Sequence, residues 1–395
     1  MNKLGLYIHI PFCETKCPYC DFNTYSGIEN LIPEYMDALN KEIRFWGSSL
    51  QGNYLVDTIF LGGGTPSYLP SNQLMTINQN LMNSFCFDDD IEFTMEVNPG
   101  DIIASSAINT KNTKINRLSL GVQSLDDSLL QVLGRRHSSD DACDAFKIAR
   151  KSGFNNISID LIYGIPYQSM AQWEQTLKRS LELQPEHISA YCLTLEEGTP
   201  MHYQVGVGRL PEPDPDLAAD MYLTADAILK EAGYSNYEIS NWAQLGMESR
   251  HNLRYWLNDD YIGVGPGAHS HLEHFRFHNL KSPRQYIQIL KELNDTTINL
   301  DNISDSLDEL PFIGGYEHID KSTKIVESIM LGLRLGKGID KLKFKEQFGK
   351  EIQDIFPSQL SDLTSSCLIE DTGEYLKLNS DAKLLANEVI VRFLE

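Results

Sequence analysis

The stretch IPFCETKCPYCDF, residues 10–22, places three cysteines in one short loop directly after a strand-like run, LGLYIHI. Cys13, Cys17 and Cys20 have the spacing C-x3-C-x2-C. The chain holds seven cysteines, an odd number, and three of them lie in this loop. In a long chain such a group is typical of a metal site rather than of a disulfide framework.

Two kinds of metal site are compatible with three thiols at this spacing. A structural zinc ion prefers four ligands, and His9 and Asp21 are candidates for the fourth. An iron–sulfur cubane is normally held by four thiolates, so three thiolates leave one iron open to a ligand from outside the protein. The residues alone leave both kinds of site open.

Strand-like and helix-like segments alternate through the first half of the chain. The strand-like runs are LGLYIHI, TIFLGG, IEFTMEV, RLSLGV, ISIDLIYG and HISAYCLTL. Residues 32–46 and 171–183 have helical periodicity between such runs. This alternation predicts βαβ units with a parallel sheet. We expect an α/β fold whose six units form a partial (β/α)6 barrel, with the site at the carboxyl ends of the strands.

Three regions are expected along the chain. Residues 1–210 would form the barrel with the cysteine loop, and the Pro- and Asp-rich stretch GRLPEPDPDLAAD would end it before a new helix. Residues 211–323 would extend the barrel. Residues 324–395 would form a smaller, mostly helical domain, with a helix at IVESIMLGLRL and a hairpin at EDTGEYLKLN.

The charge balance and the apolar pattern exclude some classes of protein. The formal net charge is −22, which opposes binding to nucleic acid because phosphate contacts need clustered Lys and Arg. No apolar run reaches the roughly 18 residues of a membrane-spanning helix. The first residues, MNKLGLYIHIPF, lack the pattern of a signal peptide. A cytoplasmic location is therefore expected.

Glycines and polar residues follow the predicted strands. The GGGTPS motif, which contains Gly63 and Gly64, supplies bare backbone for close approach to a ligand. No Lys follows it to make a phosphate loop. Glu96, Gln123 and Asp160 lie at or just beyond the ends of three apolar strands. Because parallel strands end at the same edge of a barrel, these side chains are expected to share one site.

The cysteine motif resembles that of the radical S-adenosylmethionine (SAM) superfamily. The resemblance implies a [4Fe-4S] cluster on the three cysteines, with the open iron bound to the amino and carboxylate groups of SAM. It implies that the glycine-rich motif contacts those same groups of SAM and that polar residues at the strand ends reach its ribose and methionine moiety. The residues to which it assigns SAM or cluster contacts are Tyr7, Tyr19, Gly63, Gly64, Thr65, Glu96, Gln123, Arg135 and Asp160.

Further motifs narrow the resemblance to the HemN/HemW group, which contains oxygen-independent coproporphyrinogen III oxidases and HemW-type haem chaperones. They are LYIHIPFCETKCPYCDF, FLGGGTPS, EVNPG, GVQS, ISIDLIYGIP and HNLRYW. The oxidases carry a fourth cysteine where this chain has Phe22, and a longer segment before the first cysteine, which here is Cys13. HNLRYW matches the H-N-x-x-Y-W motif of the chaperone branch, so the resemblance favours that branch.

The HNLRYW motif brings a histidine and a tyrosine together. His251 and Tyr255 are neighbours on a helix at i and i+4, and on a strand they share a face. Histidine is a common axial ligand of haem iron. Together with the resemblance, this implies haem contact by both residues, against the alternative of a histidine that is only hydrogen-bonded in a packed layer. His269 and His271 are alternative haem residues.

The expected function is that of a haem chaperone with a SAM-ligated [4Fe-4S] cluster, which passes haem to an acceptor protein and lacks coproporphyrinogen oxidase activity. The alternative is the oxidase reaction itself, a radical decarboxylation of coproporphyrinogen III. A third reading is a zinc-stabilised binding protein without SAM. The identity of the acceptor and the oligomeric state stay open, and a homodimer is compatible with the resemblance.

Overall fold

A parallel sheet forms the centre of the molecule in the computed structural model, which describes residues 1–105, 113–293, 297–298 and 303–394. Six strands pair in parallel and in chain order. They are β1 (Asn2–Ile10), β2 (Tyr54–Gly63), β3 (Phe87–Val97), β4 (Arg117–Gln123), β5 (Ile157–Tyr163) and β6 (His187–Cys192). This order confirms the predicted series of six βα units.

The sheet is open rather than closed into a full barrel. Within the described residues its order is β12-β11-β10-β9-β1-β2-β3-β4-β5-β6-β8-β7. The outer strands are β7 (Ser235–Glu238), β8 (Asn241–Ala243), β9 (Tyr261–Val264), β10 (His269–Leu272), β11 (Phe275–Asn279) and β12 (Ile313–His318). The partial barrel is confirmed, while the pairing of these short segments onto both edges was not foreseen.

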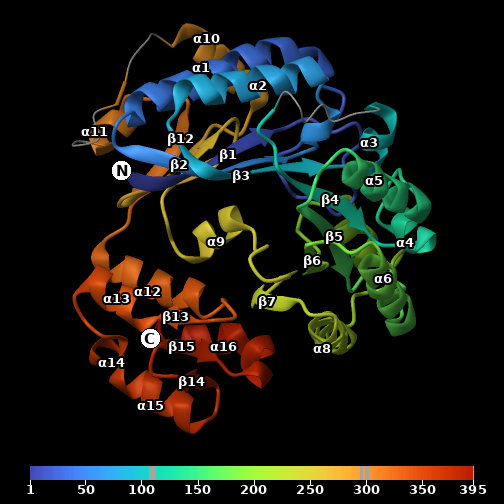
Figure 1. Cartoon of the computed structure of the whole chain (residues 1–395), viewed down its shortest axis with the longest axis vertical. Coiled ribbons are helices and arrows are strands. Elements are labelled where there is room, and N and C mark those ends of the chain that lie inside the picture. The colour runs from blue at the N-terminus through green and yellow to red at the C-terminus, as the bar shows by residue number, and fades with distance from the viewer. Residues whose placement is uncertain (106–112, 294–296, 299–302, 395) are drawn as a thin grey trace.

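Helices cover the outside of the sheet (Figure 1). They are α1 (Ile32–Leu50), α2 (Ser71–Ser84), α3 (Pro99–Ser105), α4 (Asp127–Val132), α5 (Ser139–Lys151), α6 (Met170–Glu182), α7 (Pro200–Gly206), α8 (Pro215–Glu231), α10 (Pro283–Glu292) and α11 (Ile303–Asp308). Ser138 and Ser169 begin α5 and α6 with capping boxes, which satisfy otherwise free backbone N–H groups. Among the described residues, no helix combines the length and the apolar character needed to cross a bilayer.

The alternation of side chains along each strand separates the core from the barrel interior. In β4, Leu118, Leu120 and Val122 are fully buried in the core that the outer helices share. Arg117 and Ser119 point to the opposite side, where they line a cavity. The period of two in the sequence RLSLGV therefore determines which residues of this strand are available to a ligand.

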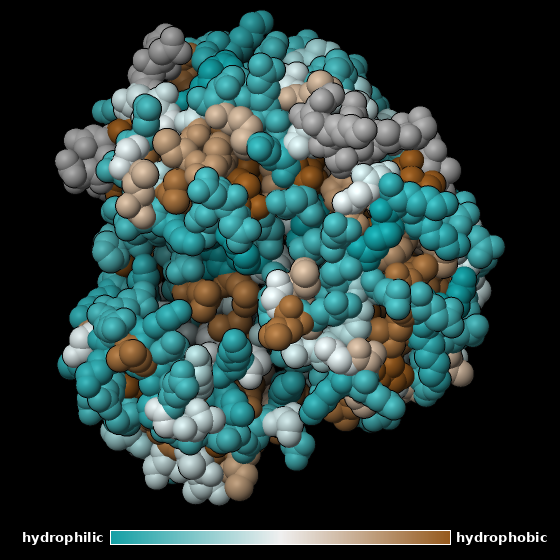
Figure 2. All heavy atoms as spheres, viewed as in Figure 1, coloured by the Kyte–Doolittle hydropathy of each residue, from teal (hydrophilic) through white to brown (hydrophobic). Residues whose placement is uncertain are grey.

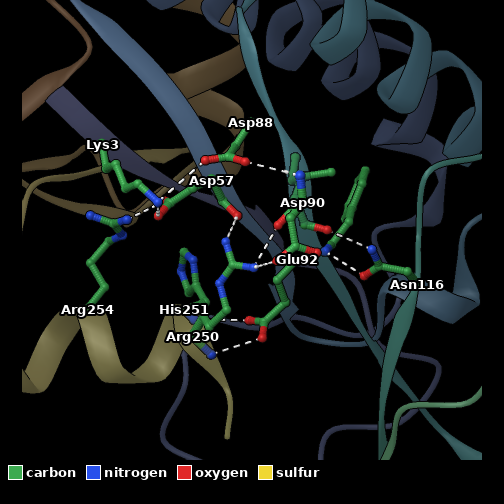
Figure 3. Close-up of polar contacts among 11 residues, drawn as sticks. Lys3, Asp57, Asp88, Asp90, Glu92, Asn116, Arg250, His251 and Arg254 are labelled. Carbon is green, nitrogen blue, oxygen red and sulfur yellow. Dashed lines mark hydrogen bonds and ion pairs between the residues drawn. The ribbon is translucent and has the colours of Figure 1, made fainter. Parts of the chain in front are cut away.

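A short helix, α9 (Arg250–Trp256), packs below the strands and is joined to β2 and β3 by buried polar contacts (Figure 3). The Glu92 carboxylate accepts hydrogen bonds from the backbone N–H groups of the first two helix residues, at 2.9 and 3.0 Å. Arg254 forms a buried ion pair with Asp57 of β2. These contacts place α9 across the inner end of the barrel, where it acts as a floor.

The C-terminal region has a hydrophobic core of its own. It contains α12 (Lys321–Gly332), β13 (Ile339–Asp340), α13 (Lys341–Phe348), α14 (Ile352–Ile355), α15 (Pro357–Ser365), β14 (Ile369–Asp371), β15 (Tyr375–Leu378) and α16 (Ala386–Val391). β14 and β15 pair antiparallel, so the predicted hairpin is present. In Figure 1 this region, coloured orange to red, lies beside α9 and β7, and the Gly336 N–H donates to the Tyr237 carbonyl at 2.8 Å.

Candidate functional site

One cavity of about 540 Å³ gathers the residues that the sequence assigned to the cluster and SAM, together with His251 and Tyr255. It lies inside the open barrel, between the loops that follow the strands and the floor made by α9. The predicted residues in its lining are Tyr7, Cys13, Cys17, Tyr19, Cys20, Gly63, Gly64, Thr65, Glu96, Gln123, Arg135, Asp160, His251 and Tyr255. The structure shows that these residues lie together, and their roles stay predictions.

The cysteine loop lies at the mouth of this cavity and is held by backbone hydrogen bonds. The Cys13 N–H donates to the Tyr25 carbonyl at 2.9 Å, and the Cys20 N–H donates to the Cys17 carbonyl at 3.1 Å. Burial raises the pKa of the Cys13 and Cys20 thiols. Arg135 donates to the Cys17 sulfur at 3.4 Å, so a cation lies beside the position where thiolate charge would develop.

The donor set fits an iron–sulfur cluster. Among the described residues, no three His, Cys, Asp or Glu side chains are placed to hold one metal ion. His9 is unavailable as a fourth ligand, because its Nδ1 accepts from the Tyr7 hydroxyl and its Nε2–H donates to the Asn23 carbonyl, both at 2.9 Å. In a cubane each thiolate binds a different iron, so the sulfurs need not converge on one point.

The glycine-rich motif after β2 brings bare backbone against the cysteine loop. A Cβ on Gly64 would lie 2.6 Å from the Phe12 carbonyl oxygen and 3.0 Å from the Cys13 sulfur. Gly63 has a φ of 113°, a conformation that favours glycine. The Thr65 hydroxyl donates to the Cys13 sulfur at 3.6 Å. Glycine at position 64 therefore allows this motif to pack directly against the cysteine loop beside Cys13.

Two half-buried carboxyls face the cavity from β3 and β5. The Gly63 N–H donates to Glu96 at 3.0 Å. Asp160 accepts hydrogen bonds from the hydroxyls of Ser119, at 2.7 Å, and Ser158, at 3.0 Å. Burial, and secondly repulsion from Asp160, raises the pKa of Glu96 to about 8. Burial also raises the pKa of Asp160. A cationic ligand such as a sulfonium or an ammonium would favour the ionised forms of both.

Glu96→Gln should flatten part of the pH dependence of stability. Because the pKa of Glu96 rises from 4.5 to about 8 on folding, the folded chain binds more protons than the unfolded chain between these values. The contribution of Glu96 is thus present at low pH and is lost as the pH rises from about 4.5 to about 8. The unfolding temperature of the metal-free chain should fall less steeply over this pH range in Glu96→Gln than in the native chain. Parallel curves for the two proteins would contradict the assignment.

Arg135 and Gln123 line the same wall of the cavity. Besides Cys17, the Arg135 guanidinium donates to the Gly121 carbonyl at 2.9 Å and to Asn98 at 3.2 Å. Arg135 is thus held beside the cysteine loop, and its contact with SAM stays a prediction. Gln123 has a φ of 65°, which is uncommon for a residue with a side chain and is typical of constrained positions at functional sites.

His251 and Tyr255 form the floor of the cavity on α9, and the helical alternative for HNLRYW is the one observed. His251 is 1% exposed and stacks on Phe60, with ring centroids 5.5 Å apart. Its Nδ1 lies 3.0 Å from the Thr58 hydroxyl and its Nε2 lies 2.9 Å from the Tyr255 hydroxyl. Burial, then the neighbouring arginines, lowers the pKa of His251 to about 3, so the ring is neutral.

Both ring nitrogens of His251 are therefore engaged, as in the packed-layer alternative, and axial ligation of haem by His251 would require one of these contacts to break. The alternative histidines lie elsewhere. His269 and His271 are on β10 and do not belong to the cavity lining, and His271 Nδ1 is 3.2 Å from the Asp259 carbonyl.

Sequence reasoning missed a second polar layer at the inner end of the cavity. Arg117, His187 and Tyr237 belong to it. The His187 Nδ1 lies 2.8 Å from the Ser158 hydroxyl and its Nε2 lies 2.8 Å from the Tyr237 hydroxyl. The signal was present in β4, since the period of two that places Gln123 toward the interior places Arg117 on the same face.

Comparison with known proteins agrees with this geometry. The family model described as "Radical SAM superfamily" matches residues 7–179, and the "HemN C-terminal domain" model matches residues 319–385. The solved structure of coproporphyrinogen III oxidase HemN from Escherichia coli superposes with a TM-score of 0.81 and 23% identity, over 99% of this chain and 90% of that one. At that identity the likeness shows the shared fold.

Two curated relatives match over nearly their full length. "Heme chaperone HemW" of Bacillus subtilis (strain 168) is 37% identical over 98% of this chain and 98% of its own. The protein of the same name from Lactococcus lactis is 32% identical over 98% of this chain and 96% of its own. This chain therefore belongs to the radical SAM superfamily and, within it, to the HemW family.

Proposed function

We propose that this chain is a haem chaperone, which binds haem together with a SAM-ligated [4Fe-4S] cluster and passes the haem to an acceptor protein. The observation that carries the proposal is the single cavity, with three cysteines at its mouth and His251 and Tyr255 at its floor. Its relatives of nearly full length bear the name "Heme chaperone HemW".

The mouth of the cavity would hold the cluster and SAM. Cys13, Cys17 and Cys20 would supply the three thiolates, and the bare backbone of Gly63 and Gly64 allows close approach beside Cys13. Tyr7, Tyr19, Thr65, Glu96, Gln123, Arg135 and Asp160 would line the SAM pocket. A bound cluster in its reduced state would supply the electron for cleavage of a SAM carbon–sulfur bond.

The floor of the cavity would contact haem. His251 is hydrogen-bonded to Tyr255 and to Thr58 of β2, so the His251 and Tyr255 side chains are held in place before any ligand binds. We propose that they contact haem without His251 serving as the axial ligand, since both its nitrogens already have partners. The proposal includes a cytoplasmic location and a homodimer, which light scattering of the reconstituted protein would test.

The oxidase reaction is the second candidate. Its basis is the fold and cysteine triplet shared with the HemN structure. Phe22, 61% exposed at the edge of the cavity, stands where those oxidases are expected to carry a fourth cysteine, and it counts against this candidate.

Haem titration after anaerobic reconstitution of the cluster tests the proposal. The native chain should bind haem saturably and leave coproporphyrinogen III unchanged. His251→Ala should weaken haem binding about tenfold, the effect of one lost polar contact, without moving the haem absorption bands. His269→Ala, outside the cavity, is the matched control and should bind as the native chain does. Shifted bands in His251→Ala would instead establish ligation, and porphyrinogen turnover without stable haem binding would establish the oxidase.

A further inference from the structure

The inner end of the cavity contains a buried arginine without a partner. Arg117 is 2% exposed and is one of the largest fully buried side chains. Its Nε has no hydrogen-bond partner, and its guanidinium forms no hydrogen bond or ion pair with any residue in the described part of the chain. Its side chain nevertheless lines the cavity. An unpaired buried cation costs several kcal/mol, so its retention needs a reason.

Several polar groups near Arg117 are hydrogen-bonded to other residues. The two oxygens of Asp160 accept from Ser119 and Ser158. His187 has partners on both ring nitrogens, and burial lowers its pKa so that the ring is neutral. His251 is neutral and doubly hydrogen-bonded in the same way. Arg117 thus lies near the Asp160 carboxyl, whose pKa its charge lowers against the larger effect of burial, but the two form no hydrogen bond or ion pair.

Arg117 also lies below the glycine-rich motif, level with Tyr7 of β1 in the sheet register. In the sheet register, Gly63 lies level with Val97, and Val97 pairs with Leu120, three residues beyond Arg117. At about 3.3 Å per residue, Arg117 is about 10 Å deeper than the glycine-rich motif. A ligand that reaches it must extend from the mouth of the cavity to the floor.

We propose that Arg117 is a carboxylate-binding residue, which pairs with an acidic group of a ligand at the floor of the cavity. The planar guanidinium matches a carboxylate in a bidentate geometry, and exclusion of water strengthens the pair. Two ligands of the proposed function carry such a group, the propionates of a tetrapyrrole and the amino-acid end of SAM. The depth of Arg117 favours a propionate, and this choice rests on the proposed function.

The test compares ligands that differ only in the carboxylate. Haem is titrated against its dimethyl ester, and SAM against decarboxylated SAM, on the reconstituted native chain, Arg117→Met and Arg117→Lys. For a propionate, the native chain should prefer haem to its ester by about 10- to 100-fold. Arg117→Met should lose this preference, Arg117→Lys should keep part of it, and the SAM preference should not change.

The unliganded protein provides a second readout. Arg117→Met should unfold at the same temperature as the native chain or higher, because it removes an unpaired buried charge. Arg254→Met is the comparison for stability alone: it removes a buried but paired arginine, so it should lower the unfolding temperature. If Arg117→Met fails to fold, Arg117 is a structural cation and the proposal is wrong.

The outcomes separate this proposal from the proposed function. A SAM preference that depends on Arg117, in a chain that binds no haem, would keep the carboxylate site and remove the chaperone. The carboxylate site would be overturned if the native chain and both variants bound haem and its ester equally and showed no SAM preference that depends on Arg117. The chaperone would be kept in that case. Absence of any ligand with an Arg117-dependent preference overturns the proposal in every case.

Discussion

Asp57→Ala is expected to lower the free energy of unfolding by about 3–5 kcal/mol, because it leaves the buried guanidinium of Arg254 without its counter-charge. The Asp57 and Arg254 side chains are 8% and 6% exposed, and their ion pair joins β2 to α9 (Figure 3). Urea unfolding of the native and variant chains measures the loss. The double variant Asp57→Ala with Arg254→Met should recover part of it, since the unpaired charge is removed as well.

Asp90→Ala is the matched control, because Asp90 pairs with Arg250 of the same helix at 3.1 Å but is 97% exposed. An exposed pair of this kind contributes no more than about 1 kcal/mol. A loss in Asp57→Ala as small as in Asp90→Ala would show that the buried pair does not hold α9. Figure 2 shows hydrophobic side chains on the surface close to the part of this face where Figure 1 places α9.

Serine substitution of Cys13, Cys17 or Cys20 should reduce the bound iron to background after anaerobic reconstitution. Each of these cysteines would ligate one iron of the proposed cluster, so a single loss leaves two thiolates where four ligands are normal. Iron and sulfide analysis, with the visible absorption of the cluster, measures the effect. Zinc in place of iron in the native chain would contradict the proposal directly.

Cys86→Ser and Cys367→Ser provide the controls for these variants. Both cysteines are exposed and lie outside the cavity lining. Iron content in these two variants should equal that of the native chain. Loss of iron in either control would mean that the reconstituted iron is bound elsewhere or non-specifically, and the cysteine loop would lose its assignment.

The binding variants change positions inside the molecule and not on the surface drawn in Figure 2. The face shown is mainly hydrophilic, with hydrophobic side chains in scattered patches. The variants at Arg117 and His251 alter buried positions, so they leave this surface unchanged. Differences in ligand binding between them and the native chain can therefore be attributed to the cavity.

Much of the fold and of the cavity mouth could be predicted because the signals are local. The runs LGLYIHI and RLSLGV have the composition of strands, and Ser138 and Ser169 begin helices with capping boxes. Parallel strands end at one edge, so the residues that follow them, such as Glu96 and Asp160, lie together in the cavity. The cysteine spacing likewise lies within one loop.

What the sequence determined by itself was the alternation of strands and helices, the cysteine loop and the family. What only the tertiary structure decided was the floor of the cavity. The helix that carries His251 is held by Glu92, 159 residues earlier, and Thr58 engages its ring from 193 residues away. Whether a buried residue is paired, as Arg254 is, or unpaired, as Arg117 is, depends on such long-range contacts, which no local pattern of residues records.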